Sequence, residues 1–387
     1  MYRIECEKNF SIALSTLSFG DRVEILFHDN GRKKVAYFKE MFDNSTFRYR
    51  CTNFGQALEN SKKYEITYFL VSEIPAIKQY LNRISIVVLQ RTQWFPEIDN
   101  LIYLAHRGNI PVVFDMDDRY YKPEHAIEYI SHIGIHSASN SVSSHFGSTV
   151  SYYMAAKNCD AFITTTPALK RELEGDFSKP TYVIPNFMNN EQLEESEYVI
   201  QNRVADTGRF VLGYFSGSPS HHTDFLSIGK ELSYLLNKHG NMDLVIVGFM
   251  DMDAELKKLA RKNRVRFRPF VPYEQLQYEI GSVDVNLIPL VPNEFNEAKS
   301  ELKFFEAGAV KVPSCATPTA VYRSIIRNGE NGFLCEYGDW IDSIEKLYSD
   351  EALRKDIAQN AYDTALRLYS SNVMTSLIEE TYDAVLG

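Results

Sequence analysis

Residues 210–249 read FVLGYFSGSPSHHTDFLSIGKELSYLLNKHGNMDLVIVGF. Two apolar runs, 210–217 and 243–249, flank an amphipathic stretch at 223–240. Short runs of apolar and β-branched residues predict strands, and the longer periodic stretch between them predicts a helix. Because both strands are apolar on both faces, the segment predicts two parallel strands of a sheet that helices cover on both sides.

The same alternation continues along the rest of the chain. The first half has strand candidates at VEILFHD (23–29), EITYFLVS (65–72), ISIVVLQ (84–90), IPVVFDMDD (110–118), AFITTTP (161–167) and TYVIP (181–185), and the second half adds VRFRPF (265–270), VDVNLIPL (283–290), KVPSCA (311–316) and GFLC (332–335). Two such series predict an α/β protein with two doubly wound, Rossmann-like lobes. We expect the ligand cleft between them, at the carboxyl ends of the strands.

The domain boundary is predicted at residues 189–208, a polar and acidic segment without a strand pattern that is typical of a linker. A first domain then covers residues 1–188 and a second covers 209–369. Residues 370–387 are amphipathic with no strand after them, and we expect this helix to pack back on the first domain.

Composition excludes several classes of protein. The formal net charge of −10 argues against a nucleic-acid partner. The five cysteines are scattered without CxxC spacing, which suits reduced thiols rather than disulfides or a zinc site. The sequence has neither an apolar run of roughly 18 residues nor a signal-peptide core, so we expect a cytoplasmic protein, with peripheral contact to the inner face of the membrane left open.

Residues 293–313, NEFNEAKSELKFFEAGAVKVP, predict a helix that follows an apolar strand and points its amino end at the cleft. Ser300 is a good N-cap residue, and Gly308 is expected to end the helix. The free backbone N–H groups at such an amino end bind anions.

Three charged side chains accompany this helix. Lys299 and Lys303 are four residues apart and are predicted on one face, with Glu306 on the same side. Two ammonium groups suit a diphosphate, and a carboxylate suits the two neighbouring hydroxyls of a ribose. The alternative is a solvated helix face with a weak Lys303–Glu306 ion pair.

The segments KSELKFFE (299–306) and KFFEAGAVKVPSCATP (303–318) resemble the retaining, nucleotide-sugar-dependent glycosyltransferases of family 4 (glycosyl transferases group 1), and their KSxxKxxE subgroup in particular. The resemblance implies the GT-B fold, a UDP-, GDP- or dTDP-sugar donor, and no metal or other cofactor. It also assigns Glu306 to the ribose. The family pattern has a further glutamate eight positions earlier, where this chain has Ala298, with Glu297 one residue away.

GYFSGSPSHHTDF (213–225) is similar to the phosphate-binding strand, loop and helix of the family. The small residues Gly217 and Ser218 let a phosphate approach the backbone closely. His222 is a candidate for phosphate contact, and the alternative is that it only begins a helix.

Other segments extend the resemblance. VRFRPFVPYEQL (265–276) is similar to the segment that holds the nucleotide base, which implies contacts around Arg268 and Phe270. NGENGFLC (328–335) and VIPNFMN (183–189) match further family segments in the expected order.

FDMDDRYY (114–121) follows a predicted strand of the first lobe, so Asp115, Asp117 and Asp118 are expected at the cleft. Three acids this close suit the binding of hydroxyls, a cation or a proton. A helix cap plus a solvated acid accounts for only part of the cluster, and Mg²⁺ is a less favoured reading. Arg91 ends the preceding strand and is expected to hold the acceptor or pair with these acids.

The family also has a glycine-rich loop in its first lobe. The first strand of the family's first lobe is followed by a glycine-rich loop, and LSFGDR (17–22) is the candidate here.

The resulting hypothesis is sugar transfer, with retention, to a glycan or lipid-linked saccharide in cell-surface polysaccharide biosynthesis, alongside partner glycosyltransferases. The assigned roles are charge stabilisation and positioning at the reacting bond by Asp117, Lys303 and Lys299, donor binding by Glu306, Ser300, Gly217, Ser218, His222, Arg268 and Phe270, and acceptor binding by Arg91, Asp115 and Asp118. Alternatives are a nucleotide-sugar epimerase or hydrolase, a non-catalytic sugar-nucleotide-binding subunit, and a periplasmic-type binder.

Overall fold

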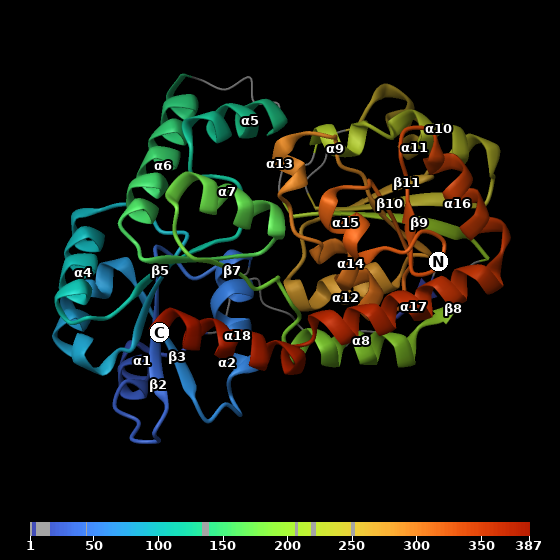
Figure 1. Cartoon of the computed structure of the whole chain (residues 1–387). Coiled ribbons are helices and arrows are strands. Elements are labelled where there is room, and N and C mark those ends of the chain that lie inside the picture. Colours follow the sequence, from blue (N-terminus) through green and yellow to red (C-terminus); the bar gives the residue numbers. More distant parts are fainter. Residues whose placement is uncertain are drawn as a thin grey trace.

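The computed structural model shows two α/β lobes side by side (Figure 1). It describes residues 2–4, 16–43, 45–133, 139–205, 208–217, 222–248 and 252–387. Each lobe is built on a six-stranded sheet in which every pair of neighbouring strands is parallel. The sequence prediction of two doubly wound lobes is therefore confirmed.

The first sheet has the order β3-β2-β4-β5-β6-β7. Its strands are β2 (Lys33–Lys39), β3 (Tyr64–Leu70), β4 (Ile86–Gln90), β5 (Val112–Met116), β6 (Ala161–Thr164) and β7 (Thr181–Val183). The helices of this lobe are α1 (Phe19–Ile25), α2 (Asn53–Ala57), α3 (Ile74–Ile77), α4 (Pro96–Arg107), α5 (Pro123–Ile133), α6 (Ser139–Lys157) and α7 (Pro167–Phe177), and the π-helical turn η1 (Arg48–Thr52) precedes α2.

The second sheet has the order β11-β10-β9-β12-β13-β14. Its strands are β9 (Phe210–Ser216), β10 (Met242–Gly248), β11 (Val265–Arg268), β12 (Val285–Ile288), β13 (Ser314–Ala316) and β14 (Phe333–Leu334). The helices of this lobe are α9 (His222–Leu226), α10 (Gly229–Lys238), α11 (Ala254–Arg261), α12 (Tyr273–Gly281), α13 (Glu294–Glu297), α14 (Leu302–Ala309), α15 (Ala320–Ile325), α16 (Asp339–Ser349) and α17 (Glu351–Tyr369). In both sheets the strand order reverses beside an early strand, which is the place where such folds bind ligands.

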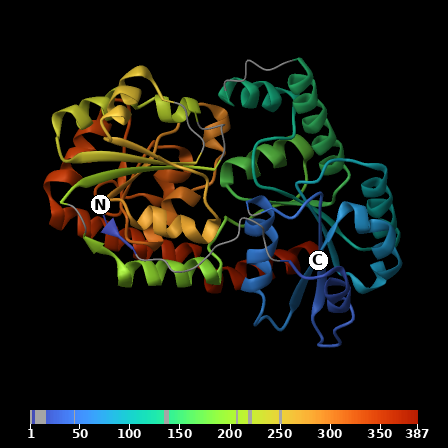
Figure 2. The ribbon, with the colours of Figure 1, turned by 180° about the vertical axis from the view of Figure 1, so that it is seen from behind.

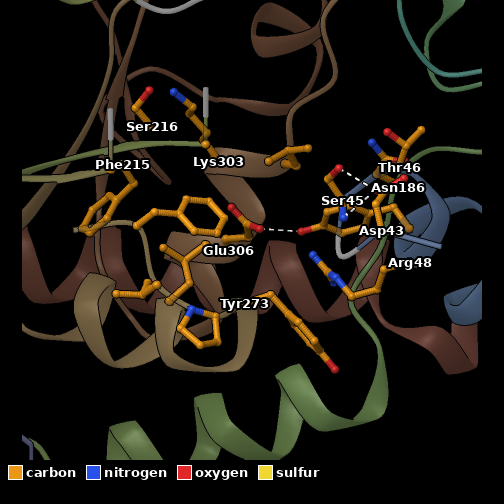
Figure 3. A pocket seen from close by; sticks show the side chains of 18 of the residues that line it. Asp43, Ser45, Thr46, Arg48, Asn186, Phe215, Ser216, Tyr273, Lys303 and Glu306 are labelled. Atoms are coloured by element: carbon orange, nitrogen blue, oxygen red, sulfur yellow. Dashed lines mark hydrogen bonds between the residues drawn. The ribbon is translucent and has the colours of Figure 1, made fainter. Parts of the chain in front are cut away.

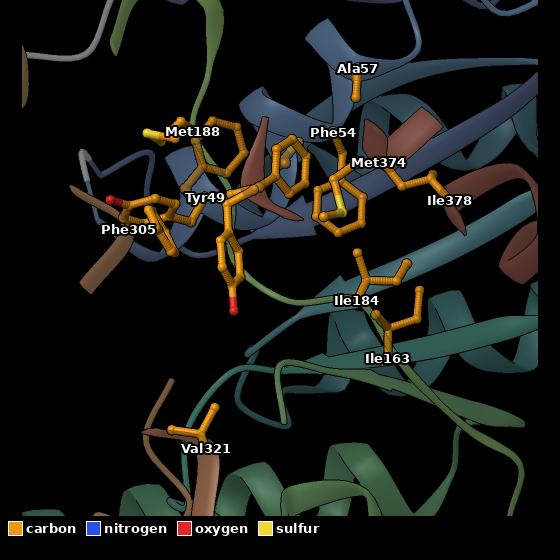
Figure 4. Close-up of a cluster of buried hydrophobic side chains, with 14 of the residues drawn as sticks. Tyr49, Phe54, Ala57, Ile163, Ile184, Met188, Phe305, Val321, Met374 and Ile378 are labelled. Carbon is orange, nitrogen blue, oxygen red and sulfur yellow. The ribbon is translucent and has the colours of Figure 1, made fainter. Parts of the chain in front are cut away.

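A buried apolar cluster runs through both lobes and ties them together (Figure 4). It includes Tyr49 and Phe54 of the first lobe and Phe305 of the second. The Phe305 ring lies 6.5 Å from the Tyr49 ring and 4.7 Å from the stacked ring of Tyr369, measured between centroids. The shared cluster means that separating the lobes exposes apolar surface, which opposes opening.

The last helix, α18 (Ser371–Leu386), lies against α2 of the first lobe. The Thr375 hydroxyl donates to the carbonyl of Ala57 over 2.7 Å. The hydroxyl groups of Tyr37 and Tyr382 are 2.8 Å apart in the core of that lobe. The chain thus crosses from the second lobe back to the first at its end.

One predicted strand was wrong, and one strand was not predicted. Residues 23–29 do not form a strand, because Ser18 and Asp21 form a capping box that starts α1. The first strand of the sheet is instead β2, whose sequence KKVAYFK begins and ends with lysine. Lys34 is buried there because its Nζ pairs with Glu65 at 2.5 Å, so its charge hid the strand from a search for apolar runs.

The predicted linker is largely a helix, α8 (Asn190–Asn202), which contacts α12 and α14. Asn189 caps it by accepting a hydrogen bond from the Gln192 N–H at 2.8 Å.

The predicted first domain also needs a correction at its start. Strand β1 (Tyr2–Arg3) pairs with β8 (Val204–Ala205) beside the second lobe, as the position of the N-terminus in Figure 2 shows.

None of the helices in the described ranges combines the length and apolar character that crossing a bilayer requires.

We expect Gly308→Ala to destabilise the packing of α14 on α17. A β-carbon at this position would lie 2.8 Å from the Ala361 carbonyl oxygen and 3.1 Å from the Ala365 β-carbon. Such overpacking costs about 1–3 kcal/mol, measurable by urea unfolding. Gly175→Ala in helix α7 is the control, since it meets nothing within 4 Å and is expected to be neutral or slightly stabilising. Equal stability of the two variants would contradict the packing argument.

Candidate active site

A cleft of about 860 Å³ lies between the lobes (Figure 3). The polar lining residues of the first lobe are Thr16, Glu40, Asp43, Ser45, Thr46, Arg48, Tyr49, Asp117 and Asn186. The second lobe contributes polar and apolar residues, among them Phe215, Ser216, Gly217, Gly248, Phe270, Tyr273, Asn286, Lys303 and Glu306. Most of these residues follow the carboxyl ends of strands or lie on the helices next to them, as expected for parallel sheets.

Helix α14 begins later than predicted, at Leu302, and its N-cap residue Glu301 makes no side-chain capping hydrogen bond. Ser300 does not cap the helix. Its hydroxyl accepts a hydrogen bond from the Asn186 side chain of the first lobe at 3.1 Å. Gly308 does not end the helix either, since α14 continues to Ala309. Its lack of a side chain serves the close approach to α17.

Lys303 extends from the first turn of α14 into the cleft, as Figure 3 shows. Its Nζ is buried and makes no hydrogen bond with any residue that the structure describes, although it lies 4.8 Å from the centroid of the Tyr214 ring. Burial, together with the nearby charge of Lys299, lowers the pKa of Lys303 to about 8. A buried cation in this state favours an anionic ligand.

Lys299 lies before α14 rather than on it, and it is not among the lining residues of the cleft. Its Nζ is 3.5 Å from a carboxylate oxygen of Asp224, which is fully buried in α9. Asp224 also accepts hydrogen bonds from Val291 N–H and from the Asn296 side chain, at 2.9 and 2.8 Å. Asp224 therefore fixes the loop before α14, a role that the sequence reasoning did not assign to it.

Glu306 is 5% exposed and points into the cleft from the second turn of α14. Tyr49 of the opposite lobe donates a hydrogen bond from its hydroxyl to Glu306 Oε1. Burial raises the pKa of the Glu306 carboxyl, and the Tyr49 hydroxyl acts in the opposite direction. Lys303 and Glu306, three residues apart, thus bring a cation and a hydrogen-bond acceptor to one wall, as predicted for the pair.

Arg48 was missed by the sequence reasoning. Its guanidinium carbon lies 3.9 Å from the centroid of the Tyr49 ring and 4.2 Å from that of Tyr273 in α12. Its Nη1 donates to the Gln192 side chain at 2.8 Å. Arg48 therefore links the first lobe to the second lobe and to α8 at the floor of the cleft.

Asp115 is not an acceptor-side residue, contrary to the prediction. It is fully buried in β5, and the Arg50 guanidinium pairs with it at 3.0 Å. Burial raises the pKa of Asp115 to about 6, although the Arg50 charge opposes the shift. The cluster of three acids predicted ligand binding. Asp115, however, neutralises the buried Arg50, and the sequence around Asp115 does not reveal this partner.

Of the other two acids only Asp117 lines the cleft, whereas Asp118 and Arg91 are not among its lining residues. Asp117 lies 3.5 Å from the guanidinium of Arg91, so the ion pair weighed from the sequence is present. Arg91 itself adopts a left-handed backbone conformation with φ of 42°. Asp118 accepts a hydrogen bond from the Arg119 N–H at 2.8 Å, and burial raises its pKa while Arg91 opposes the shift.

Among the remaining predicted donor contacts, Gly217 and Phe270 line the cleft. Arg268 pairs with Glu279 and is not a lining residue, so its side chain serves the second lobe. His222 only begins α9 and does not line the cleft. Ser218 lies outside the described residues.

The predicted glycine-rich loop was misplaced. LSFGDR (17–22) belongs to the start of α1, and the first strand of the sheet is followed instead by residues 40–46. Within that loop Asp43 accepts hydrogen bonds from the N–H and hydroxyl of Ser45, at 2.8 and 2.6 Å. Hydrogen bonds from Ser45 to the Asp43 carboxylate therefore occur where a glycine-rich loop was expected.

The described ranges hold no group of three or more His, Cys, Asp or Glu side chains arranged to bind a metal ion.

Residues 211–350 match the family described as "Glycosyl transferases group 1". The matched residues lie in the second lobe. The chain is also 24% identical, over 205 residues, to the capsular polysaccharide biosynthesis glycosyltransferase CapM of Staphylococcus aureus. That match covers 51% of this chain and 51% of CapM, so the chain spans about half the length of this curated relative.

Solved structures agree over nearly the whole chain. HepE of Anabaena, solved in complex with UDP and glucose, superposes with a TM-score of 0.60 at 16% identity, covering 91% of this chain and 100% of HepE. A glycosyltransferase of Rickettsia africae gives a TM-score of 0.60 at 14% identity, covering 92% and 99%. These likenesses confirm the predicted fold, the two Rossmann-like lobes of the GT-B type.

Proposed function

We propose that this chain is a glycosyltransferase that moves a sugar from a nucleoside diphosphate to a hydroxyl of a glycan or lipid-linked saccharide. The group 1 domain over residues 211–350 and the GT-B fold support this activity. The likeness to CapM, named for capsular polysaccharide biosynthesis, supports a place in making cell-surface polysaccharide. The proposal includes retention at the anomeric carbon, membership of family 4 with the KSxxKxxE pattern, and action at the cytoplasmic face of the membrane beside partner enzymes.

The observation that carries the proposal is the pair Lys303 and Glu306 in the cleft. They lie one turn apart on α14. Glu306 is buried, and the Lys303 Nζ is buried and free of hydrogen bonds among the described residues. A diphosphate beside the amino end of α14 meets the ammonium and the free N–H groups of the first turn. The ribose then lies one turn deeper, at the Glu306 carboxylate.

The proposed reaction follows from this position of the diphosphate and the ribose. As the glycosidic bond loosens, negative charge builds on the leaving diphosphate, and Lys303 stabilises it together with the fixed N–H dipoles. Lys299 contributes to the local positive field from outside the cleft. For retention, the acceptor hydroxyl attacks from the face that the diphosphate leaves, and a phosphate oxygen takes its proton. Asp117, held by Arg91, positions the sugar or acceptor.

The donor and acceptor would lie between the two lobes, and closure of the lobes over them would exclude water, which otherwise hydrolyses the donor. The proposal needs no metal or bound cofactor, because lysine side chains and helix N–H groups meet the diphosphate charge.

We expect the affinity for a nucleoside diphosphate to fall as pH rises through about 8. Below the pKa of Lys303 the ammonium is already charged, whereas above it binding must also take up a proton, which costs up to about tenfold per pH unit. Titration calorimetry between pH 7 and 9.5 measures this slope. Lys303→Arg should flatten it, because guanidinium stays charged, and equal slopes in both proteins would contradict the assignment.

The activity itself is tested with the purified chain and a panel of UDP-, GDP- and dTDP-sugars. A thermal-shift screen first identifies the nucleotide, because a ligand that binds only the folded state raises the melting temperature. Transfer of the labelled sugar to a saccharide acceptor, with analysis of the anomeric configuration, then tests reaction and stereochemistry. Release of free sugar without transfer would favour a hydrolase, and a changed donor sugar would favour an epimerase.

A second candidate function is a non-catalytic sugar-nucleotide-binding subunit. Ala298 stands where the family pattern has its first glutamate, and it is buried. The neighbouring Glu297 cannot substitute in this conformation, because its carboxylate accepts a hydrogen bond from the Ala320 N–H at 2.8 Å. Nucleotide binding without donor turnover would support this candidate over the enzyme.

A further inference from the structure

Tyr49 is the residue by which the first lobe reaches Glu306. It lies in the turn η1, is 6% exposed, and its hydroxyl donates to Glu306 Oε1 across the cleft. Burial, with the neighbouring Glu306 carboxylate, raises the pKa of Tyr49 far above its ordinary value. The phenol therefore stays protonated and acts as a hydrogen-bond donor at any physiological pH.

The backbone beside Tyr49 is held firmly. Phe47 and Phe54 on either side of it are fully buried. Arg50, the next residue, pairs with Asp115 and also donates to the Ile184 carbonyl at 2.7 Å. These neighbours hold the backbone of Tyr49 in place, so the position that its hydroxyl can reach is fixed.

The ring itself is held between the two lobes. Arg48 stacks on it at 3.9 Å, and Phe305 of α14 meets it edge to face with the centroids 6.5 Å apart. Because Phe305 precedes Glu306 on the same helix, the ring and the hydroxyl of Tyr49 contact adjacent residues of the second lobe. The contact therefore depends on the lobes being together.

The carboxylate of Glu306 has few other restraints. Within the described part of the chain, Tyr49 is the residue that hydrogen-bonds to it, while Gln277 holds only the backbone carbonyl of Glu306, at 3.3 Å. A carboxylate has about four lone-pair sites, so the bond from Tyr49 leaves acceptors for two ribose hydroxyls. Without it the side chain is free to adopt other rotamers.

We propose that Tyr49 is a positioning residue, which holds the Glu306 carboxylate in the orientation that accepts hydrogen bonds from the ribose of the donor. This rests on the proposed function. Since the two residues belong to different lobes, recognition of the nucleotide by the second lobe is complete only when the first lobe is closed on it.

The test compares ribonucleotides with their deoxy counterparts. We expect Tyr49→Phe to weaken binding of UDP or GDP, whichever the wild-type chain binds, by about tenfold, the effect of losing one hydrogen bond to a charged group. Binding of 2′-deoxy-UDP or 2′-deoxy-GDP should weaken less. The ratio of the affinity for the ribonucleotide to that for the deoxynucleotide should therefore fall toward one. A purely structural role for Tyr49 would weaken both nucleotides equally, and an unchanged ratio would overturn the proposal.

Tyr37→Phe is the matched control. Tyr37 is likewise buried in the first lobe, and its hydroxyl lies 2.8 Å from that of Tyr382, away from the cleft. This variant loses a comparable buried hydrogen bond, and we expect it to keep the wild-type ribo-to-deoxy ratio. A ratio that narrows equally in both variants would also overturn the proposal.

A second measurement separates this proposal from the function on which it rests. The free energies of urea unfolding of Tyr49→Phe, Glu306→Ala and the double variant form a thermodynamic cycle without any ligand. Non-additive losses support the positioning contact, and additive losses overturn it. If the wild-type chain binds no nucleotide, the proposed function fails, and the cycle still decides whether Tyr49 orients Glu306.

Discussion

Glu306→Ala is expected to abolish detectable donor binding while the two lobes remain folded. The carboxylate is proposed to accept hydrogen bonds from both ribose hydroxyls, and bonds to a charged group contribute about 1.5–3 kcal/mol each, so the affinity should fall about 100-fold or more. Titration calorimetry with the nucleoside diphosphate that the wild type binds measures the loss.

The variant also removes a charge whose burial is costly, because Glu306 is 5% exposed and its pKa is raised. The stability of the fold should therefore change much less than the affinity. Glu297→Ala is the control, since Glu297 holds the amino end of α15 through Ala320 and does not line the cleft. Wild-type affinity in Glu306→Ala would remove Glu306 from the binding site.

The largest loss of stability is expected from Asp115→Asn. The side chain is fully buried and pairs with Arg50, which is equally buried. Removing one partner of such a pair leaves an uncompensated charge in the core, which costs about 3–5 kcal/mol. Urea unfolding followed by circular dichroism measures the change.

The double variant Asp115→Leu with Arg50→Met tests the cause. It removes both charges and keeps apolar volume, so it should recover most of the stability that the single variant loses. Arg50 also donates to the Ile184 carbonyl at 2.7 Å, so recovery is expected to be incomplete. A single variant as stable as the wild type would show that the pair contributes nothing to the fold.

Most strands could be predicted because parallel strands buried on both faces appear as continuous apolar runs. β9 (Phe210–Ser216) is of this kind, and so is the IVVL segment of β4 (Ile86–Gln90). β2 was not predicted because it contains Lys34. This lysine is buried and is neutralised by Glu65 of β3, a partner 31 residues away. Residues 23–29 were wrongly predicted as a strand because their apolar run continues the helix that Ser18 and Asp21 start.

The candidate site could be predicted where its chemistry is local. Lys303 and Glu306 lie three residues apart on one helix, so helical geometry alone brings them together. Tyr49 could not be found in this way, because it lies 257 residues from Glu306 and meets it only across the cleft. Asp115 was misassigned because its partner Arg50 is 65 residues away, and sequence spacing does not show which buried charge an acid compensates.

The same limit explains Lys299. Its spacing from Lys303 suggested a shared face, but α14 starts only at Leu302, and the lysine turns to the buried Asp224. Ser300, expected from the sequence to cap the helix, instead accepts a hydrogen bond from Asn186 of the other lobe, a partner that local sequence does not show.

The most direct measurement is a crystal structure of the chain with its nucleoside diphosphate bound. We predict the diphosphate at the first turn of α14, within reach of the Lys303 ammonium, and the ribose hydroxyls within hydrogen-bond distance of the Glu306 carboxylate. A nucleotide seated outside the cleft between the lobes, or a Glu306 carboxylate turned away from the ribose, would contradict the account.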